Sequence, residues 1–189
     1  DPSWKSAEYF TVAGVLDTPY WLYHGTGALL SVVTGSAERA NIVMLSVVGL
    51  AYPYALRTLL VALKKDPRLA LFGCGLFWST NLIVGILNFV ASVPVVLFAL
   101  ALVIRQSERS SVRRSVGLAA LAIAIFYLHL SSFALLVLDA ALLTWILQGR
   151  PQGFLRSLLV LPRRLLWLAP AGALGLVVFL RGHTIRGGA

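Results

Sequence analysis

Long apolar runs separated by short basic segments dominate the pattern of the chain. Residues 41–63 are long enough to cross a bilayer core of about 30 Å, at about 1.5 Å per helical residue. Residues 69–104 and 116–147 form two further runs, each longer than one ordinary membrane span. This pattern predicts an all-α protein, organised as a polytopic transmembrane helical bundle.

The positions of the basic residues favour a helical hairpin for each of the two long runs. Lysine and arginine gather in three segments, 64–68, 105–114 and 149–164. Two hairpins place all three segments on one side of the membrane, which the positive-inside rule identifies as cytoplasmic. We therefore predict about six membrane helices, some of them short and hairpin-paired, with turns near 79–81 and 129–131.

The first forty residues differ from the rest of the chain. Residues 20–33 are a short apolar-leaning stretch that opens with aromatic side chains, which is typical of a membrane interface. We expect residues 1–40 to form an outer-side loop and an interfacial or re-entrant helix. Residues 41–180 are then the transmembrane bundle and 181–189 a tail. The chain starts without a methionine, which suggests a processed product or a fragment of a longer protein.

The composition supports a membrane protein and disfavours other classes. The chain is 59% hydrophobic and 12% charged, whereas soluble domains are about 45–50% apolar and about 25% charged. The formal net charge is +9, but the basic residues stand in short segments between apolar runs. We therefore expect anionic membrane lipids as partners, and no nucleic acid. The single cysteine excludes a disulfide framework within one chain.

Polar residues inside the apolar runs are candidates for lining a substrate site. Asn81 and Asn88 stand with Gly85 and Ser92 at helical spacing, which predicts one polar stripe. Such a stripe is expected to form interhelical hydrogen bonds or to face a polar cavity.

The second long run contributes two further candidates. His129 and Ser132 share a helical face close to the predicted turn. Two charges, Arg57 and Asp139, are predicted to be embedded in the membrane. Arg57 can extend toward the basic end of its helix, whereas Asp139 must snorkel, take up a proton, or pair with a base such as Arg57.

Established catalytic and metal-binding patterns are absent from the sequence. There is no Walker loop, dinucleotide fingerprint or nucleophile elbow, and the three histidines lack metal-ligand spacing. No metal site is predicted, and no cofactor is indicated. Asp17 is the candidate catalytic carboxylate, because on the outer side it could act as a base or bind a cation. A solvated loop residue is the alternative reading of Asp17.

The succession of segments over roughly residues 18–147 resembles bacterial polytopic membrane proteins of GT-C-like architecture. Those proteins often carry a Gly-x-x-Asn-Phe helix and, after an arginine-rich loop, a segment with Tyr, His and Phe positions. The matching residues here are Gly85, Asn88 and Phe89, followed by Tyr127, His129 and Phe133.

The resemblance implies glycosyl transfer from a polyprenyl-phosphate sugar in a bacterial inner membrane, with the acceptor on the outer side. Such enzymes usually place an acidic catalytic residue in the first outer loop, and Asp17 is not matched to that position. Whether the chain is an enzyme stays open. The alternative is a non-catalytic transmembrane subunit in a larger membrane complex, with polar groups paired helix to helix. A small transporter is a third reading, but no inverted repeat supports it.

Overall fold

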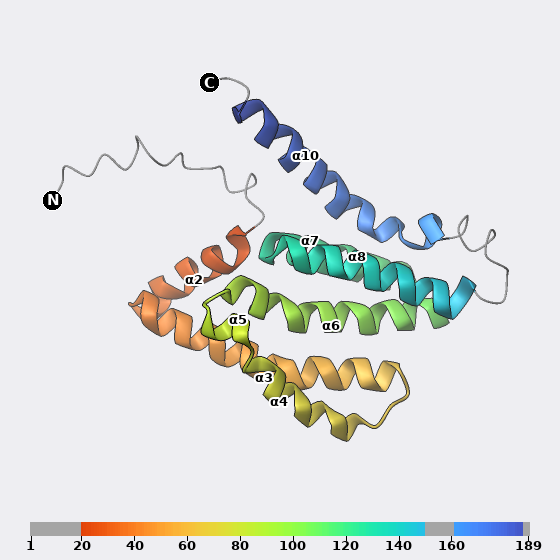
Figure 1. The fold of residues 1–189 in the computed structure, drawn as a ribbon, viewed down its shortest axis with the longest axis horizontal. Helices are drawn as coiled ribbons and strands as arrows, with labels where there is room; N and C mark the ends of the chain where they lie inside the picture. The colour runs from red at the N-terminus through yellow and green to blue at the C-terminus, as the bar shows by residue number, and fades with distance from the viewer. Residues whose placement is uncertain (1–19, 150–160, 187–189) are drawn as a thin grey trace.

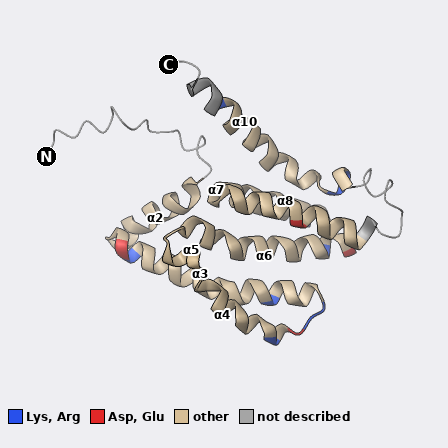
Figure 2. Cartoon of the chain, viewed as in Figure 1, with Lys and Arg blue, Asp and Glu red and all other residues tan. Residues whose placement is uncertain are grey.

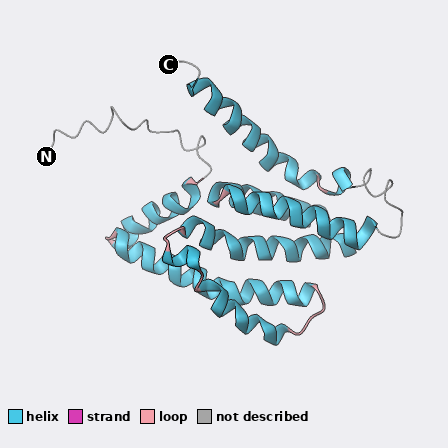
Figure 3. Cartoon of the chain, viewed as in Figure 1, coloured by secondary structure: helices cyan, strands magenta, loops and turns pink. Residues whose placement is uncertain are grey.

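The computed structural model describes residues 20–149 and 161–186, and within these ranges it is helical and contains no strand (Figure 3). The prediction of an all-α protein is confirmed for this part of the chain. The elements in chain order are α2 (Trp21–Thr34), α3 (Ala37–Ala62), η1 (Pro67–Leu71), α4 (Phe72–Phe77), α5 (Thr80–Ile83), α6 (Leu87–Glu108), α7 (Val112–Leu128), α8 (Leu130–Thr144), η2 (Trp145–Gly149), η4 (Leu166–Leu168) and α10 (Ala169–Arg186).

Three helices are long and apolar enough to cross a membrane. They are α3, α6 and the helix Leu130–Leu147, which α8 and the start of η2 form together. Only 17% of the apolar stretch of α3 and 22% of that of Leu130–Leu147 are buried inside the protein. Most residues of these two helices are therefore not buried by the rest of the described protein, as expected of helices surrounded by lipid. The described residues thus support a membrane protein with three candidate spans, where about six were predicted.

Helix α6 lies at the centre of the arrangement, with α3 along one side and the pair α7 and α8 along the other (Figure 1). The main core forms where α6, α7 and α8 meet, and Leu118, Ile125 and Leu136 are fully buried there. Trp167 of η4 and Ala171 of α10 close this core on a further side. The packing fixes α7 and α8 against α6, and so positions the turn that joins them.

The run 116–147 is interrupted at His129, where the sequence predicts a turn. Helix α7 ends at Leu128 and α8 begins at Leu130, with His129 in extended backbone geometry between them (φ −161°, ψ 122°). The His129 N–H donates to the Ile125 carbonyl at 2.8 Å, and its own carbonyl accepts from the Phe133 N–H at 3.1 Å. The two helices pack against each other as a hairpin.

The run 69–104 differs from its prediction. Its first arm consists of η1, α4 and the short α5, where a helix of full hairpin length was expected. Gly85 adopts a left-handed conformation (φ +84°) before α6 starts at Leu87, which glycine does without a steric penalty. Asn81 and Asn88 therefore lie on different helices, and the predicted continuous polar stripe was wrong.

Helices α2 and α3 are joined by a tight connection. The expected helix over 20–33 is present as α2, and it ends at Gly35 in left-handed geometry (φ +70°). Helix α3 starts at Ala37, earlier than predicted, because the Ser36 hydroxyl accepts a hydrogen bond from the Arg39 N–H at 3.5 Å. Glu38 in the first turn also favours this start, since a carboxylate is stabilised at a helix N-terminus.

Two of the predicted basic segments lie at the same end of the helices. The Lys64 ammonium after α3 is 3.4 Å from the Glu108 carboxylate at the end of α6. The Arg114 guanidinium donates to the carbonyl oxygens of Arg105 and Arg109, at 2.9 and 2.5 Å. Figure 2 shows lysine and arginine gathered at this end of α3 and α6. The α7–α8 turn lies at the opposite end.

Parts of several predictions lie outside the described residues. These parts are residues 1–19 with the catalytic candidate Asp17, residues 150–160 of the third basic segment, and residues 187–189 of the tail. Helix α10 continues to Arg186, so most of the predicted tail is helical.

Candidate site at the α7–α8 turn

Aromatic side chains gather around the α7–α8 turn, at the end of the helices opposite the two basic segments. They come from the start of α2, the first turn of α6, the end of α7 and the turn itself. We call this group the aromatic cluster, and its members are Tyr20, Trp21, Phe89, Tyr127 and His129. Phe89 and His129 lie far apart in the sequence, and the fold brings their rings together.

The rings of the aromatic cluster contact one another in pairs. The His129 ring centroid is 5.4 Å from that of Tyr20 and 5.3 Å from that of Phe89, and both pairs are T-shaped. Trp21 and Tyr127 are 5.7 Å apart and tilted by 58°. Each such pair contributes about 0.5–1.5 kcal/mol beyond the area it buries. These contacts hold α2 against the tip of the hairpin.

Three polar atoms of the aromatic cluster are buried without a hydrogen-bond partner. They are the indole Nε1 of Trp21, the hydroxyl of Tyr127 and the Nδ1 of His129. The Tyr127 side chain is only 6% exposed. A buried polar atom without a partner costs about 1–3 kcal/mol, so these three atoms are the candidates within the aromatic cluster for hydrogen bonds to a ligand.

The protonation state of His129 decides whether its unpartnered nitrogen can donate or accept a hydrogen bond. Burial lowers the pKa of His129 below its usual value of 6.5, so the imidazole is neutral at pH 7 and carries one donor and one acceptor nitrogen. The Trp21 indole can only donate, and the Tyr127 phenol can donate or accept. This mixed set complements hydroxyl groups, which also donate and accept.

Ser132, a predicted substrate-lining residue, lies inside the protein beside the aromatic cluster. It is 1% exposed, and its hydroxyl oxygen is 2.6 Å from that of Ser92. Because the Ser92 hydroxyl donates to the Phe89 carbonyl at 2.6 Å, the Ser132 hydroxyl is the donor to Ser92. The pair links α6 to α8.

The asparagine candidates are placed less centrally. Asn81 in α5 and Asn88 in α6 are both half-buried, and neither belongs to the aromatic cluster. Asn88 immediately precedes Phe89, which does belong to it. The arrangement therefore brings His129 together with Phe89, but it does not unite the asparagines with His129 in one site.

The two embedded charges do not pair. Arg57 is exposed on α3, and Asp139 is half-buried on α8. Within the described residues Lys64 pairs with Glu108, whereas neither Arg57 nor Asp139 takes part in an ion pair. No contact joins Arg57 to Asp139, and α6 lies between α3 and α8 (Figure 1).

Sequence reasoning missed Trp21 as a member of the site. The sequence signal that could have indicated it is the position of aromatic residues at helix ends. Tyr20 and Trp21 stand at the start of α2, and Tyr127 and His129 stand at the end of α7. Nothing in the sequence gives the rotation of α2 that brings these rings together. Among the described residues, no group of three His, Cys, Asp or Glu side chains could hold a metal ion.

Comparison of the chain with family models, with curated proteins and with solved structures gives no match in any of the three.

Proposed function

We propose that this chain is part of a GT-C-like membrane glycosyltransferase and that its aromatic cluster binds the sugar of a polyprenyl-phosphate donor. The observation that supports this function is that three members of one group of aromatic rings each carry a buried polar atom without a hydrogen-bond partner. Small-molecule sites combine apolar and aromatic walls with a few placed polar groups. The aromatic cluster has both parts.

A sugar ring matches both parts of the cluster. Its C–H faces pack against aromatic rings, while its hydroxyls exchange hydrogen bonds with donor and acceptor groups. The Trp21 N–H would donate to a sugar oxygen, and the Tyr127 hydroxyl and the His129 Nδ1 would complete the exchange. The half-exposed Tyr20, with 38% of its surface accessible, marks the side from which a ligand reaches the cluster.

The proposed placement in the membrane is multi-pass, in a bacterial inner membrane. Together with the three candidate spans, the shorter helices α2, α7 and α10 would bring the number of membrane-embedded helices to about six. The basic segments face the cytoplasm by the positive-inside rule. The aromatic cluster then lies at the outer surface, at the level of lipid headgroups, where the sugar phosphate of a polyprenyl donor is found.

The proposed transfer breaks the bond between sugar C1 and the phosphate oxygen and forms a bond from C1 to an acceptor oxygen. The acceptor proton passes to a carboxylate base, and the polyprenyl phosphate leaves with the bonding electron pair. Asp17 stays the proposed base, and it lies outside the described residues. The cluster's part is to bind and orient the sugar, which lowers the entropic cost of reaction.

Binding of a short-chain polyprenyl-phosphate hexose to the purified native protein in nanodiscs tests the function. Trp21→Phe and Tyr127→Phe each remove one polar atom and keep an aromatic ring. We expect each to weaken binding about tenfold, the equivalent of one hydrogen bond of about 1.4 kcal/mol. Tyr54→Phe is the matched control, because Tyr54 is 66% exposed on α3 and outside the cluster. Wild-type protein that does not bind the donor would refute the function.

The alternative, a non-catalytic subunit of a larger membrane complex, is favoured by one observation. The buried hydroxyls of Ser92 and Ser132 are paired between helices, as that reading predicts. Chemical crosslinking in native membranes tests it: a defined set of partner chains attached to the outward faces of α2 and α3 would support a subunit, and sugar transfer by the isolated chain would contradict it.

A further inference from the structure

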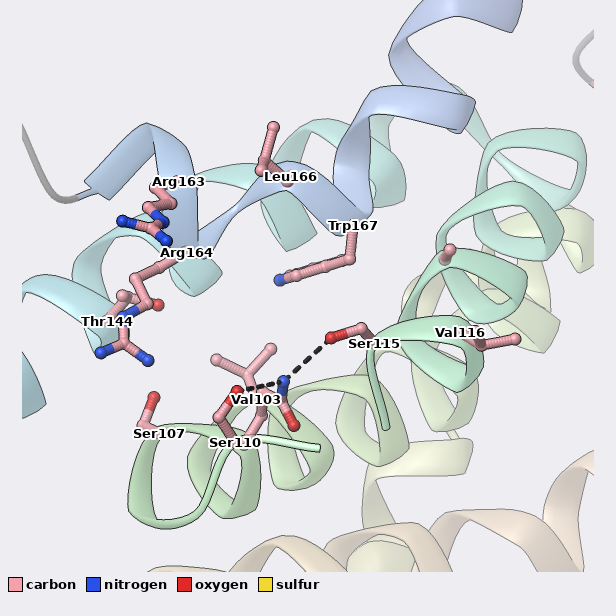
Figure 4. A pocket seen from close by; sticks show the side chains of 12 residues that line it. Val103, Ser107, Ser110, Ser115, Val116, Thr144, Arg163, Arg164, Leu166 and Trp167 are labelled. Atoms are coloured by element: carbon pink, nitrogen blue, oxygen red, sulfur yellow. Dashed lines mark hydrogen bonds between the residues drawn. The ribbon is translucent and has the colours of Figure 1, made fainter. Parts of the chain in front are cut away.

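A cavity of about 860 Å³ lies at the basic end of the helices, and no member of the aromatic cluster lines it. It is lined by the end of α6, the start of α7, the end of α8 and residues between 163 and 167 (Figure 4). Its volume is within the range of about 300–1,000 Å³ that small-molecule sites have.

The polar side of the cavity offers hydrogen-bond donors and positive charge. Arg163 and Arg164 line it together with the hydroxyls of Ser110, Ser115 and Thr144, and no carboxylate is among the lining residues in the described part of the chain. Figure 4 shows the two arginines on one side of the space and the serines on the other. Guanidinium groups pair with phosphate through two parallel hydrogen bonds, so the lining suits a phosphate.

Two of the serines are held in place by Gln106. Its side-chain amide donates to the Ser115 hydroxyl oxygen at 2.9 Å and to that of Ser110 at 3.4 Å, while its carbonyl accepts from the Ser111 N–H at 3.1 Å. Because Gln106 occupies the serine oxygens, the serine protons can point to a ligand. The donors on this side are therefore preorganised before any ligand binds.

The same cavity has an apolar edge that reaches the outer surface of the helices. Val116 and Leu166 line it, and each is 64% exposed. Trp167 also lines the cavity, and its indole nitrogen points into the space in Figure 4. A polar recess bordered by exposed apolar residues matches a molecule that carries a phosphate on hydrocarbon chains.

We propose that this cavity binds the phosphate headgroup of an anionic membrane phospholipid, whose acyl chains lie against Val116 and Leu166. A soluble phosphate shares the headgroup chemistry, but it makes no use of the apolar edge. Basic recesses between membrane helices at the cytoplasmic surface are typical sites for anionic lipid headgroups. The inference rests on the membrane placement proposed above, and it is independent of sugar binding at the aromatic cluster.

The test measures the binding of phosphatidylglycerol to the delipidated native protein in neutral detergent, with phosphatidylcholine and inorganic phosphate as comparison probes. We expect phosphatidylglycerol to bind and to raise the melting temperature, and the other two probes to leave it unchanged. The double variant Arg163→Gln/Arg164→Gln should bind phosphatidylglycerol roughly 30-fold more weakly, since each basic residue near an anionic surface contributes about 1 kcal/mol.

A matched control removes the same charge elsewhere at the basic end. Lys65→Gln/Arg68→Gln changes two exposed residues outside the cavity and should weaken binding less than about threefold if the cavity is the site. Equal loss in both double variants would overturn the proposal in favour of diffuse surface attraction. An equal response to inorganic phosphate would overturn the lipid as ligand. If the cavity variant fails to fold, the three probes on the wild-type protein still test the proposal. Equal binding of phosphatidylcholine and phosphatidylglycerol would refute an anionic headgroup site.

Discussion

The Tyr52 hydroxyl donates a hydrogen bond to the carbonyl oxygen of Val90 at 3.0 Å, and this is the carbonyl that Pro94 leaves without its helical donor. In an α-helix the N–H of residue 94 would bond to the carbonyl of residue 90, but proline has no N–H. Val90 is fully buried, and Pro94 lies inside α6. A side chain of α3 thus completes the backbone of α6.

This relationship predicts a stability effect that depends on Pro94. Tyr52→Phe should lower the free energy of unfolding by about 1–3 kcal/mol, because it leaves the buried Val90 carbonyl without a donor. In a Pro94→Ala background the same substitution should cost markedly less, since the alanine introduced there has a backbone N–H that can take that carbonyl. Unfolding in mixed micelles, measured as a double-mutant cycle, checks this. Equal losses in both backgrounds would show that the bond does not replace the missing helical one.

The Ser92–Ser132 pair predicts a loss of stability without a loss of ligand binding. Ser132→Ala should destabilise the protein by about 0.6–2 kcal/mol, the range for hydrogen bonds between membrane helices. Binding of the polyprenyl-phosphate hexose should stay unchanged, because Ser132 is buried and bonded to Ser92. Weaker binding by a fully folded Ser132→Ala variant would return Ser132 to the substrate-lining role that the sequence suggested.

Close packing of α4 against α3 predicts that Gly73 tolerates no larger residue. A Cβ at Gly73 would lie 2.8 Å from the Cα of Pro53, so Gly73→Ala forces the two backbones apart and should cost about 1–3 kcal/mol. Gly75→Ala in the same helix is the control, because nothing lies within 4 Å of its added Cβ. Thermal unfolding of the two variants should therefore differ. Similar melting temperatures would show that α4 can shift away from Pro53.

Burial of His129 predicts that stability falls in mild acid. Its pKa is lowered in the folded protein, so the unfolded chain binds a proton first as pH falls below about 6.5. Above that pH the neutral His129 leaves the stability of the fold at its full value. This contribution to stability is lost as pH drops through the lowered pKa of His129 in the folded protein. His129→Gln should reduce this dependence as pH falls from about 6.5. An unchanged pH profile in this variant would refute the assignment to His129.

Local features of the fold were predictable from the sequence. The break at His129 followed from polar residues inside an apolar run combined with the side on which the basic segments must lie. The charge pattern also predicted that the segments around Lys64 and Arg109 share one end of the helices, which the Lys64–Glu108 contact and the Arg114 hydrogen bonds show.

Relationships between helices were not predictable in the same way. The bond of Tyr52 to Val90 depends on the rotation of α3 about its axis, and Pro94 indicates only that some donor is needed. Likewise, the left-handed conformation of Gly85 separates two asparagines whose spacing alone suggests one face. The aromatic cluster depends on how α2 packs against α7. The sequence does not determine this packing, because many rotations of an apolar helix bury similar side chains.

The single-residue turn at His129 bears on how this chain is synthesised and inserted. Between the arginines at the start of α7 and Asp139 near the end of α8, the sequence holds no Lys, Arg, Asp or Glu. A translocation machinery that pushes the tip of this hairpin through a bilayer from the basic side would therefore carry no formal charge across. Both arms can partition together, so α7, which carries arginines in its first turn, needs no independent insertion signal of its own.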